Sequence, residues 1–175
     1  VANAGPTSSG PPPEKIVTLA GIIAPRMGRR DGSYADEPFA FQSREALRRA
    51  LIGEPVTFKV ESEYASREFA LVFKDGAGDI ALEHCKNGWC VGKPSREDEN
   101  DENAMKRNQL IKEAEEDAKQ FFRGKHTCDP LLLNKAVRNK SDPRLVDEFI
   151  DSKGVEPIHC VVEVALNGST MKVSV

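Results

Sequence analysis

The sequence predicts an α+β fold that is mainly β, and two observations lead to this expectation. Residues 15–23, 55–61 and 67–74 are β-branched or alternate between apolar and polar side chains, which is typical of half-buried strands. Two segments with helical periodicity, residues 39–52 and 104–122, lie among these strands rather than in a separate block. With 39% hydrophobic and 30% charged residues, the 175-residue chain has the composition of one globular domain with some length left over.

The chain begins with a loop, a strand and a turn. Residues 1–14 are rich in Gly, Ser and Pro and are predicted to form an exposed loop. The strand at residues 15–23 ends before Pro25, which has no backbone N–H to donate. A polar turn follows at residues 27–36, and this is where a functional site is expected.

The first predicted helix starts after this turn. Asp36 is the expected N-cap, and Glu37 and Pro38 suit the first helical turn. Gly53 is the expected left-handed stop. The apolar side chains share one face, formed by Ala40, Leu47, Ala50 and Leu51. Three basic side chains lie largely off that face, namely Arg44, Arg48 and Arg49.

A β-hairpin is predicted next. Its first strand, residues 55–61, is expected to turn three side chains inward, namely Val56, Phe58 and Val60. Its second strand, residues 67–74, has Phe69, Leu71 and Phe73 on one face and Ala70 and Val72 on the other. The connection at residues 62–66 is short enough for a hairpin.

A short helix is predicted at residues 80–87. Asp79 can cap its first turn, and Gly88 is expected to end it. Trp89 and Val91 follow in an extended segment, and Trp89 is expected to belong to the core.

An acidic segment precedes the longest predicted helix. Residues 93–103 are interpreted as a solvated loop rather than a calcium site, because the ligand spacing of an EF-hand loop is missing. The helix at residues 104–122 is expected to stop at Gly124. Its predicted apolar stripe consists of Leu110, Ala114, Ala118 and Phe121.

The last part of the chain is predicted to be a linker followed by a hairpin. Residues 125–156 are polar, with a helix expected from Pro143 to near Gly154. Residues 157–175 contain two β-prone runs around Asn167-Gly168, which is a strong hairpin pattern.

Charge is unevenly distributed, although the net charge is only −3. Residues 15–59 carry eight Lys and Arg against five Asp and Glu, whereas residues 60–118 carry eight against fifteen. The basic first third suits phosphate contact, and two differently solvated faces are an equally weighted alternative.

Several classes of protein and site are disfavoured by the sequence. No apolar run approaches the roughly 20 residues that cross a bilayer, so no membrane association is expected. The four cysteines lack CxxC spacing, which disfavours zinc and indicates free thiols in a reducing compartment. We expect a cytoplasmic location, with the nucleus as a second one.

The order of these elements resembles the staphylococcal-nuclease-like repeats of the Tudor staphylococcal nuclease family, and the first repeat most closely. The resemblance rests on a strand that ends at Pro25, on Glu37-Pro38-Phe39-Ala40, on Ile52-Gly53, and on the strand at residues 56–60. The flanking segments Gly10–Glu14 and Ser66–Phe69 also fit. The resemblance covers roughly residues 10–124 and implies a five-stranded OB-fold-type β-barrel with packed helices over residues 15–124.

The resemblance also implies where a nuclease site would lie, and the matching residues lack its chemistry. The family's strand arginine falls on Thr18, its metal-binding aspartate on Ile23, and its glutamate on Arg26. Only the later arginine has a counterpart, Arg67. No catalytic residue and no metal site are therefore expected, and Ca²⁺ would enter only if a nuclease alternative held.

The interpretation of function is an RNA-binding and scaffolding module acting in RNA silencing, in mRNA processing or stability, in stress granules and in transcriptional coactivation, as the resemblance implies. The expected nucleic-acid-binding residues are Arg26, Arg29, Arg30, Arg44, Arg48, Arg49 and Arg67, with Tyr34, Tyr64 and Trp89 as candidates for base stacking. The expected partners are single-stranded or structured RNA and proteins of ribonucleoprotein complexes. Two alternatives stay open: a Ca²⁺-dependent endoribonuclease whose other repeats supply activity, and a protein–protein interaction module.

The resemblance further implies that the barrel begins with a hairpin before residue 15. The hairpin at residues 157–175 resembles the opening hairpin of a following repeat, with Ser169 at the position of a metal-binding aspartate. We expect this hairpin to supply missing strands, either within one chain or by exchange in a strand-swapped dimer. The alternative is that the first hairpin precedes the given sequence.

Overall fold

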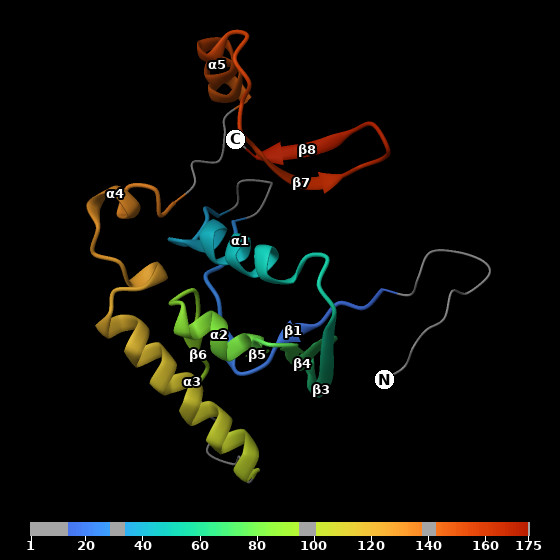
Figure 1. Ribbon diagram of the computed structural model, residues 1–175, viewed down its shortest axis with the longest axis vertical. Helices are drawn as coiled ribbons and strands as arrows, with labels where there is room; N and C mark the ends of the chain where they lie inside the picture. Colours follow the sequence, from blue (N-terminus) through green and yellow to red (C-terminus); the bar gives the residue numbers. More distant parts are fainter. Residues whose placement is uncertain (1–13, 29–33, 95–100, 138–142, 175) are drawn as a thin grey trace, which may run out of the picture. The chain divides into compact units, whose positions relative to one another are not determined.

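The computed structural model describes residues 14–28, 34–94, 101–137 and 143–174. It divides into two compact units, residues 1–138 and residues 139–175, which are described separately (Figure 1). The first unit combines strands and helices around two small cores, and the second contains one helix and one hairpin. The predicted α+β class is therefore confirmed, but the expectation of a mainly β fold is wrong for the described residues, because their helices hold more residues than their strands.

The single strand predicted at residues 15–23 is wrong, because the chain forms two short strands there. Strand β1 (Thr18–Leu19) pairs in parallel with β4 (Arg67–Lys74), and β2 (Ile22–Ile23) pairs antiparallel with β6 (Val91–Gly92). Between them Gly21 has φ +76°, a conformation that glycine adopts without steric cost. This residue redirects the chain from one sheet to another.

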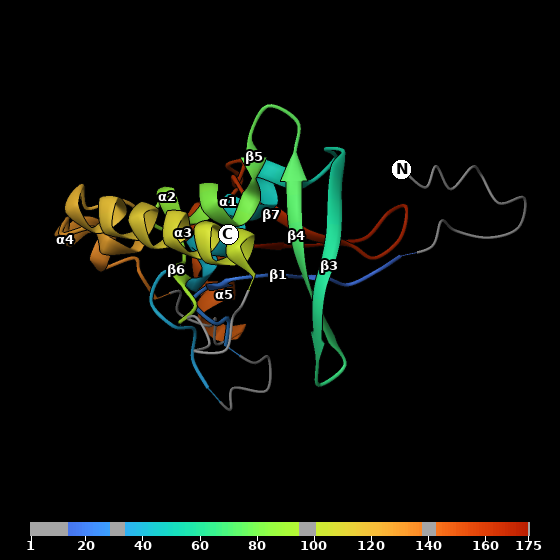
Figure 2. The ribbon, with the colours of Figure 1, turned by 90° about the horizontal axis from the view of Figure 1, so that it is seen from below.

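The predicted hairpin is confirmed, with a longer first strand and a tighter turn than expected (Figure 2). Strand β3 (Val56–Tyr64) pairs antiparallel with β4, and β5 (Gly78–Asp79) also pairs with β4. Ala65 and Ser66 form the turn with φ values of +49° and +60°. Positive φ at both central residues is the geometry that suits the twist of a two-residue hairpin.

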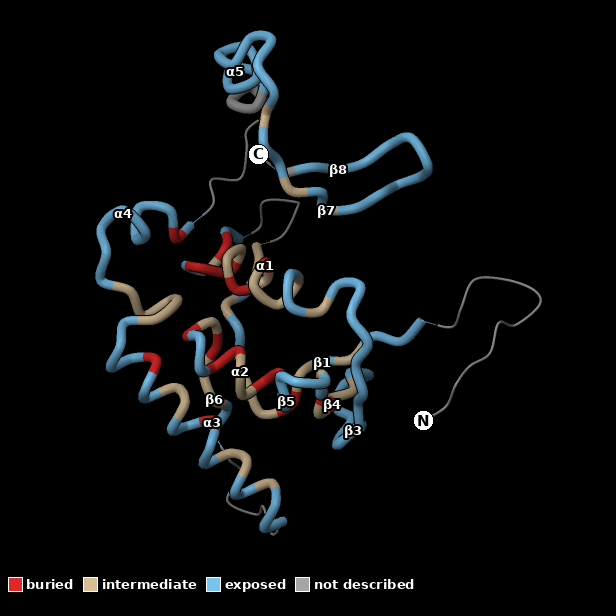
Figure 3. The backbone as a smooth tube through the Cα atoms, in the orientation of Figure 1, coloured by how far each residue is buried: buried red, intermediate tan, exposed pale blue. Residues whose placement is uncertain are grey.

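The core face of this hairpin is only partly covered. Ala70 and Val72 of β4 are buried, and the helix residues Leu47 and Ile80 pack around them. The register places Phe58 opposite Val72 and Val60 opposite Ala70, so β3 presents its apolar side chains on the same face. These β3 side chains stay exposed, however: Val56 by 41%, Phe58 by 49% and Val60 by 37%. Every residue of β3 is exposed, as Figure 3 shows.

The structure contains no closed barrel within its described residues. The sheet order is β1-β4-β3, and β2-β6 forms a separate pair. The five-stranded barrel expected from the resemblance is therefore not formed by these residues. The physical reason is that β1 and β3 are the two outer strands, and no described strand joins them.

Helix α1 spans Ala40–Leu51 and has a different start from the one predicted. Asp36 does not cap it; the N-cap position is Phe39, which has φ +63°, while Asp36 Oδ1 accepts a hydrogen bond from the Gly28 N–H at 2.6 Å. Gly53, with φ +80°, lies just past the end as predicted. The predicted apolar face is wrong at Ala50, which is exposed.

Helix α2 (Ile80–Lys86) confirms the predicted capping, since Asp79 Oδ1 accepts a hydrogen bond from the Ala81 N–H at 2.9 Å. Gly88, with φ +75°, ends the helical segment and makes a close backbone contact. A Cβ added at Gly88 would lie 2.2 Å from the Arg123 carbonyl oxygen, and Lys125 N–H donates to the Gly88 carbonyl at 2.9 Å. Glycine is therefore required where the backbone at residue 88 lies against the segment 123–125.

Helix α3 (Glu102–Gln120) begins earlier than predicted, with Asp101 as its N-cap. The predicted stripe is half wrong: Ala118 is buried and Ala114 is partly buried, but Leu110 is 51% and Phe121 is 59% exposed. Ile111, the residue after Leu110, is buried in place of Leu110. It packs with two buried cysteines that are in contact, Cys85 and Cys90.

An ion pair fixes α3 on the first unit. The Arg107 guanidinium bonds to the Asp79 carboxylate and also donates to the Ala20 carbonyl at 3.1 Å. Both charged side chains are largely buried. This contact explains the helix register, because Arg107 and Ile111 are one helical turn apart.

Residues 124–137, which the sequence places largely in a linker, are held on the first unit. They form a 3-10 turn (Gly124–His126) and α4 (Pro130–Leu133), a helix that the sequence did not predict. Gln42 Nε2 donates to the Lys135 carbonyl at 2.6 Å, and Phe39 N–H donates to the Ala136 carbonyl at 2.6 Å.

The second unit has the two predicted elements. Helix α5 spans Pro143–Lys153, and β7 (Val161–Ala165) pairs antiparallel with β8 (Met171–Ser174). No helix among the described residues is long and apolar enough to cross a membrane.

Candidate nucleic-acid interface

The turn that follows β2 is closed by Arg26 and Glu37. The Arg26 backbone N–H and its Nε each donate to the Glu37 carboxylate at 2.9 Å, and Glu37 N–H donates back to the Arg26 carbonyl at 2.9 Å. These hydrogen bonds, first from the backbone and then from the side chain of Arg26, lower the pKa of Glu37. The Arg26 side chain is still 79% exposed, so its guanidinium can reach a phosphate.

A second hydrogen bond closes the same turn, between residues that lie inside the Arg26–Glu37 pair in the sequence. The Asp36 carboxylate accepts from the Gly28 N–H, and a Cβ at Gly28 would lie 2.5 Å from the Tyr34 carbonyl oxygen. The described ends of this turn are therefore fixed next to each other. Arg29 and Arg30 belong to residues 29–33, which lie outside the described residues.

The basic residues of α1 form a second group. Arg44 Nη1 lies 3.5 Å and Arg48 Nη1 3.7 Å from the carboxylate of Glu45, which is almost fully buried. Arg49 is exposed. The charge of this group is thus partly balanced by Glu45, which the sequence did not indicate.

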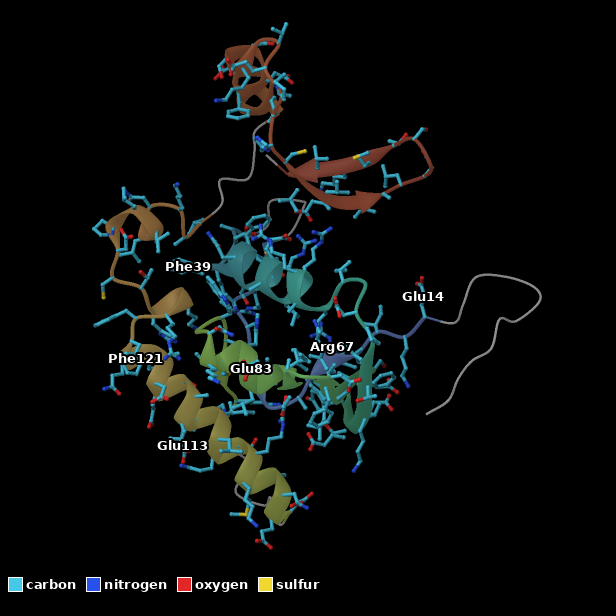
Figure 4. The ribbon with its side chains drawn as sticks, in the orientation of Figure 1. Glu14, Phe39, Arg67, Glu83, Glu113 and Phe121 are labelled. Atoms are coloured by element: carbon cyan, nitrogen blue, oxygen red, sulfur yellow. The ribbon has the colours of Figure 1, made fainter. Side chains whose placement is uncertain are left out.

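Arg67 lies apart from both groups, at the first position of β4 beside the hairpin turn (Figure 4). Its register partner across the hairpin is Tyr64, which is 71% exposed. Arg67 makes no ion pair with any acidic residue that the structure describes. An exposed cation beside an exposed ring suits contact with a nucleotide.

The residues that match the nuclease site do not fit a calcium ion. Ile23 is half exposed and has no oxygen to offer, and Arg26 brings a positive charge. The nearest carboxylate to Arg26, that of Glu37, already accepts two hydrogen bonds from it. In the described part of the chain, no three His, Cys, Asp or Glu side chains come together to hold a metal ion.

Of the three candidates for base stacking, Tyr34 and Tyr64 are exposed and Trp89 is partly buried. The structure also brings in Lys125, which sequence reasoning missed. After the hydrogen bonds and the charge of Arg26, the positive charge of Lys125 also lowers the pKa of Glu37. Nothing in the local sequence indicates this interaction, because it depends on the close approach of Gly88 to Gly124.

Comparison with known proteins gives a consistent set of relatives, although no family model matches the chain. Over 94% of its length the chain is 35% identical to Ribonuclease TUDOR 2 and 36% identical to Ribonuclease TUDOR 1, both from Arabidopsis thaliana. Over 95% of its length it is 31% identical to Staphylococcal nuclease domain-containing protein 1 from Drosophila melanogaster. The chain spans only 17% to 18% of the length of these relatives.

Proposed function

We propose that this chain, which matches a repeat of the Tudor staphylococcal nuclease proteins, binds RNA and does not cleave it. The observation that carries the proposal is the Arg26–Glu37 pair. At the end of the β2 segment, where cleavage would need carboxylates around a cation, the chain has an exposed guanidinium and a carboxylate already bonded to it. This pair offers a metal ion no unpaired carboxylate, while the exposed guanidinium can still donate hydrogen bonds to a phosphate.

The binding residues in this proposal are Arg26, Arg29, Arg30, Arg44, Arg48, Arg49 and Arg67. Since two relatives are named ribonucleases, the whole protein's activity can come from parts that this chain lacks. We propose for the whole protein a scaffolding role in RNA silencing and mRNA processing, with ribonucleoprotein partners, in the cytoplasm and also in the nucleus.

The hairpin β7–β8 is proposed to complete the first unit's sheet or that of a second copy. The support for this is the uncovered β3 face, because Val56, Phe58 and Val60 continue the core face beyond the helices.

The 175-residue chain is expected to leave single-stranded RNA intact in the presence of Ca²⁺ or Mg²⁺. The measurement is gel analysis of an end-labelled RNA after incubation with repurified protein, with and without a chelator. Cleavage that the chelator stops and that Arg67→Ala abolishes would contradict the proposal. Cleavage that Arg67→Ala leaves unchanged would indicate a contaminating nuclease, and Lys106→Ala, at an exposed position outside the interface, is the matched control.

A further inference from the structure

The first unit contains a cavity of about 380 Å³ between the start of α1 and the segment that follows α3. Figure 4 labels Phe39 at the start of α1 and Phe121 at the end of α3. Three aromatic side chains contribute to the lining, together with an amide, a leucine and a lysine: Phe39, Trp89, Phe122, Gln42, Leu132 and Lys135.

The Trp89 part of the aromatic wall is fixed through its backbone. The backbone N–H of Trp89 donates to the His84 carbonyl at 3.0 Å, and the backbone carbonyl of Trp89 accepts from Ser43 Oγ at 2.8 Å. His84 Nε2 lies 3.1 Å from the same Ser43 oxygen, and burial lowers the pKa of His84 to about 4, so the ring is neutral at pH 7. A wall fixed in this way loses little entropy when a ligand binds.

One polar group of the lining lacks a partner. Gln42 Nε2 donates to the Lys135 carbonyl, which sets the orientation of the amide. Gln42 Oε1 is buried, and no described residue donates a hydrogen bond to it. A buried acceptor without a donor is unfavourable, so a ligand N–H that reaches this oxygen after a shift of the Gln42 side chain would remove that cost.

Positive charge lies beside the cavity. Lys135 is part of the lining, and Lys125 directly follows Gly124, which also lines it. Glu37, which pairs with Arg26, lies two residues before Phe39 of the cavity lining, so the cavity adjoins the candidate interface along the chain. The carboxylate in this area, Glu37, is already paired with Arg26.

We propose that this cavity binds one unstacked base of single-stranded RNA. The aromatic side chains provide the stacking surface, Gln42 Oε1 accepts a hydrogen bond from a base N–H, and Lys125 and Lys135 face the neighbouring phosphates. An aliphatic side chain of a protein partner would fit the aromatic wall but would leave the Gln42 oxygen without a donor. The inference rests on the proposed function and assigns part of the RNA contact to a defined site.

The chain offers a direct readout, because Trp89 is its only tryptophan. A fluorescently labelled oligoadenylate of about ten nucleotides, the length range of single-strand binding sites, is titrated into the 175-residue chain. Trp89 emission should be quenched on binding. An abasic oligomer of the same length and charge should bind more weakly and leave the emission unchanged.

Phe122→Ala and Phe121→Ala form a matched pair, because both side chains are 59% exposed and only Phe122 lines the cavity. Phe122→Ala is expected to weaken oligoadenylate binding roughly tenfold, and Phe121→Ala less than about twofold. Thermal melting shows that each variant is folded, and the abasic comparison on the unaltered chain does not depend on either variant.

The possible outcomes separate the two proposals. Salt-dependent RNA binding without quenching, with equal effects of the two variants, would overturn the base site and leave the proposed function standing; an apolar protein segment would then be the better occupant. Absence of any RNA binding would overturn both. Quenching by the abasic oligomer equal to that by oligoadenylate would also overturn the base site.

Discussion

Replacing Arg26, Arg29 and Arg30 together by glutamate is expected to lower the affinity for single-stranded RNA about 100-fold at low salt. Each arginine that contacts a phosphate releases a counterion, and each glutamate in its place repels the backbone. The hydrogen bonds from Arg26 and Gly28 hold the described ends of this turn together. Anisotropy of a labelled RNA measures the effect.

The matched control replaces Lys106, Lys112 and Lys153 by glutamate, which changes the net charge equally at exposed positions outside the interface. This control should lose less than about fivefold, through the long-range field alone. Replacing the three arginines by glutamine should give an intermediate loss. Unchanged affinity in the glutamate variant would contradict this interface and move the binding face to Arg44, Arg48 and Arg49.

Deleting residues 154–175 is expected to destabilise the first unit by roughly 3 kcal/mol, if burial of the half-exposed β3 side chains is what the hairpin provides. Strand β3 has nine exposed residues and continues the core face with Val56, Phe58 and Val60. For a unit of this size, the melting temperature should fall by about 10 °C. Thermal melting and light scattering measure stability and mass.

Val173→Asp tests the hairpin without changing the chain length. Val173 pairs with Val162 in the hairpin, so a charge at this position should disrupt it. Val173→Asp should reproduce much of the loss, whereas Lys172→Asp should not. If the hairpin is exchanged between two chains, the unaltered protein should be a dimer that the deletion converts to a monomer. A deletion variant that melts at the original temperature as a monomer would show that the hairpin does not cover β3.

Features set by local sequence were predictable. Asp79 caps α2, Gly53 follows the end of α1, and Asn167-Gly168 lies in the β7–β8 hairpin, all as expected. Each depends on the conformational preference of one or two residues, which the sequence states directly.

Features set by distant contacts were not predictable. Phe39, which precedes α1 in a left-handed conformation, donates its backbone N–H to the Ala136 carbonyl. The ion pair between Arg107 and Asp79 orients α3. As a result Ile111 is buried rather than Leu110. Helical periodicity leaves a choice between neighbouring stripes, which only the packing partner decides.

The candidate site likewise combines a feature that the local sequence predicted with features that depend on distant contacts. The sequence indicated Arg26 as a cation at a position where cleavage would need an acid, and the structure adds that Glu37 bonds to it. The aromatic cavity was not predictable, because Phe39, Trp89 and Phe122 come from three separate segments. Trp89 was assigned to the core or to stacking, and the structure places it in the cavity wall.

A salt titration tests directly whether this chain binds RNA through phosphate contacts. The association constant of the 175-residue chain for single-stranded RNA is measured with chelator present, between about 50 and 200 mM salt. If three or more phosphates are contacted, log K falls linearly with log salt with a slope of about −2 or steeper. Binding that is absent at the lowest salt, or that does not change with salt, would contradict binding through phosphate contacts.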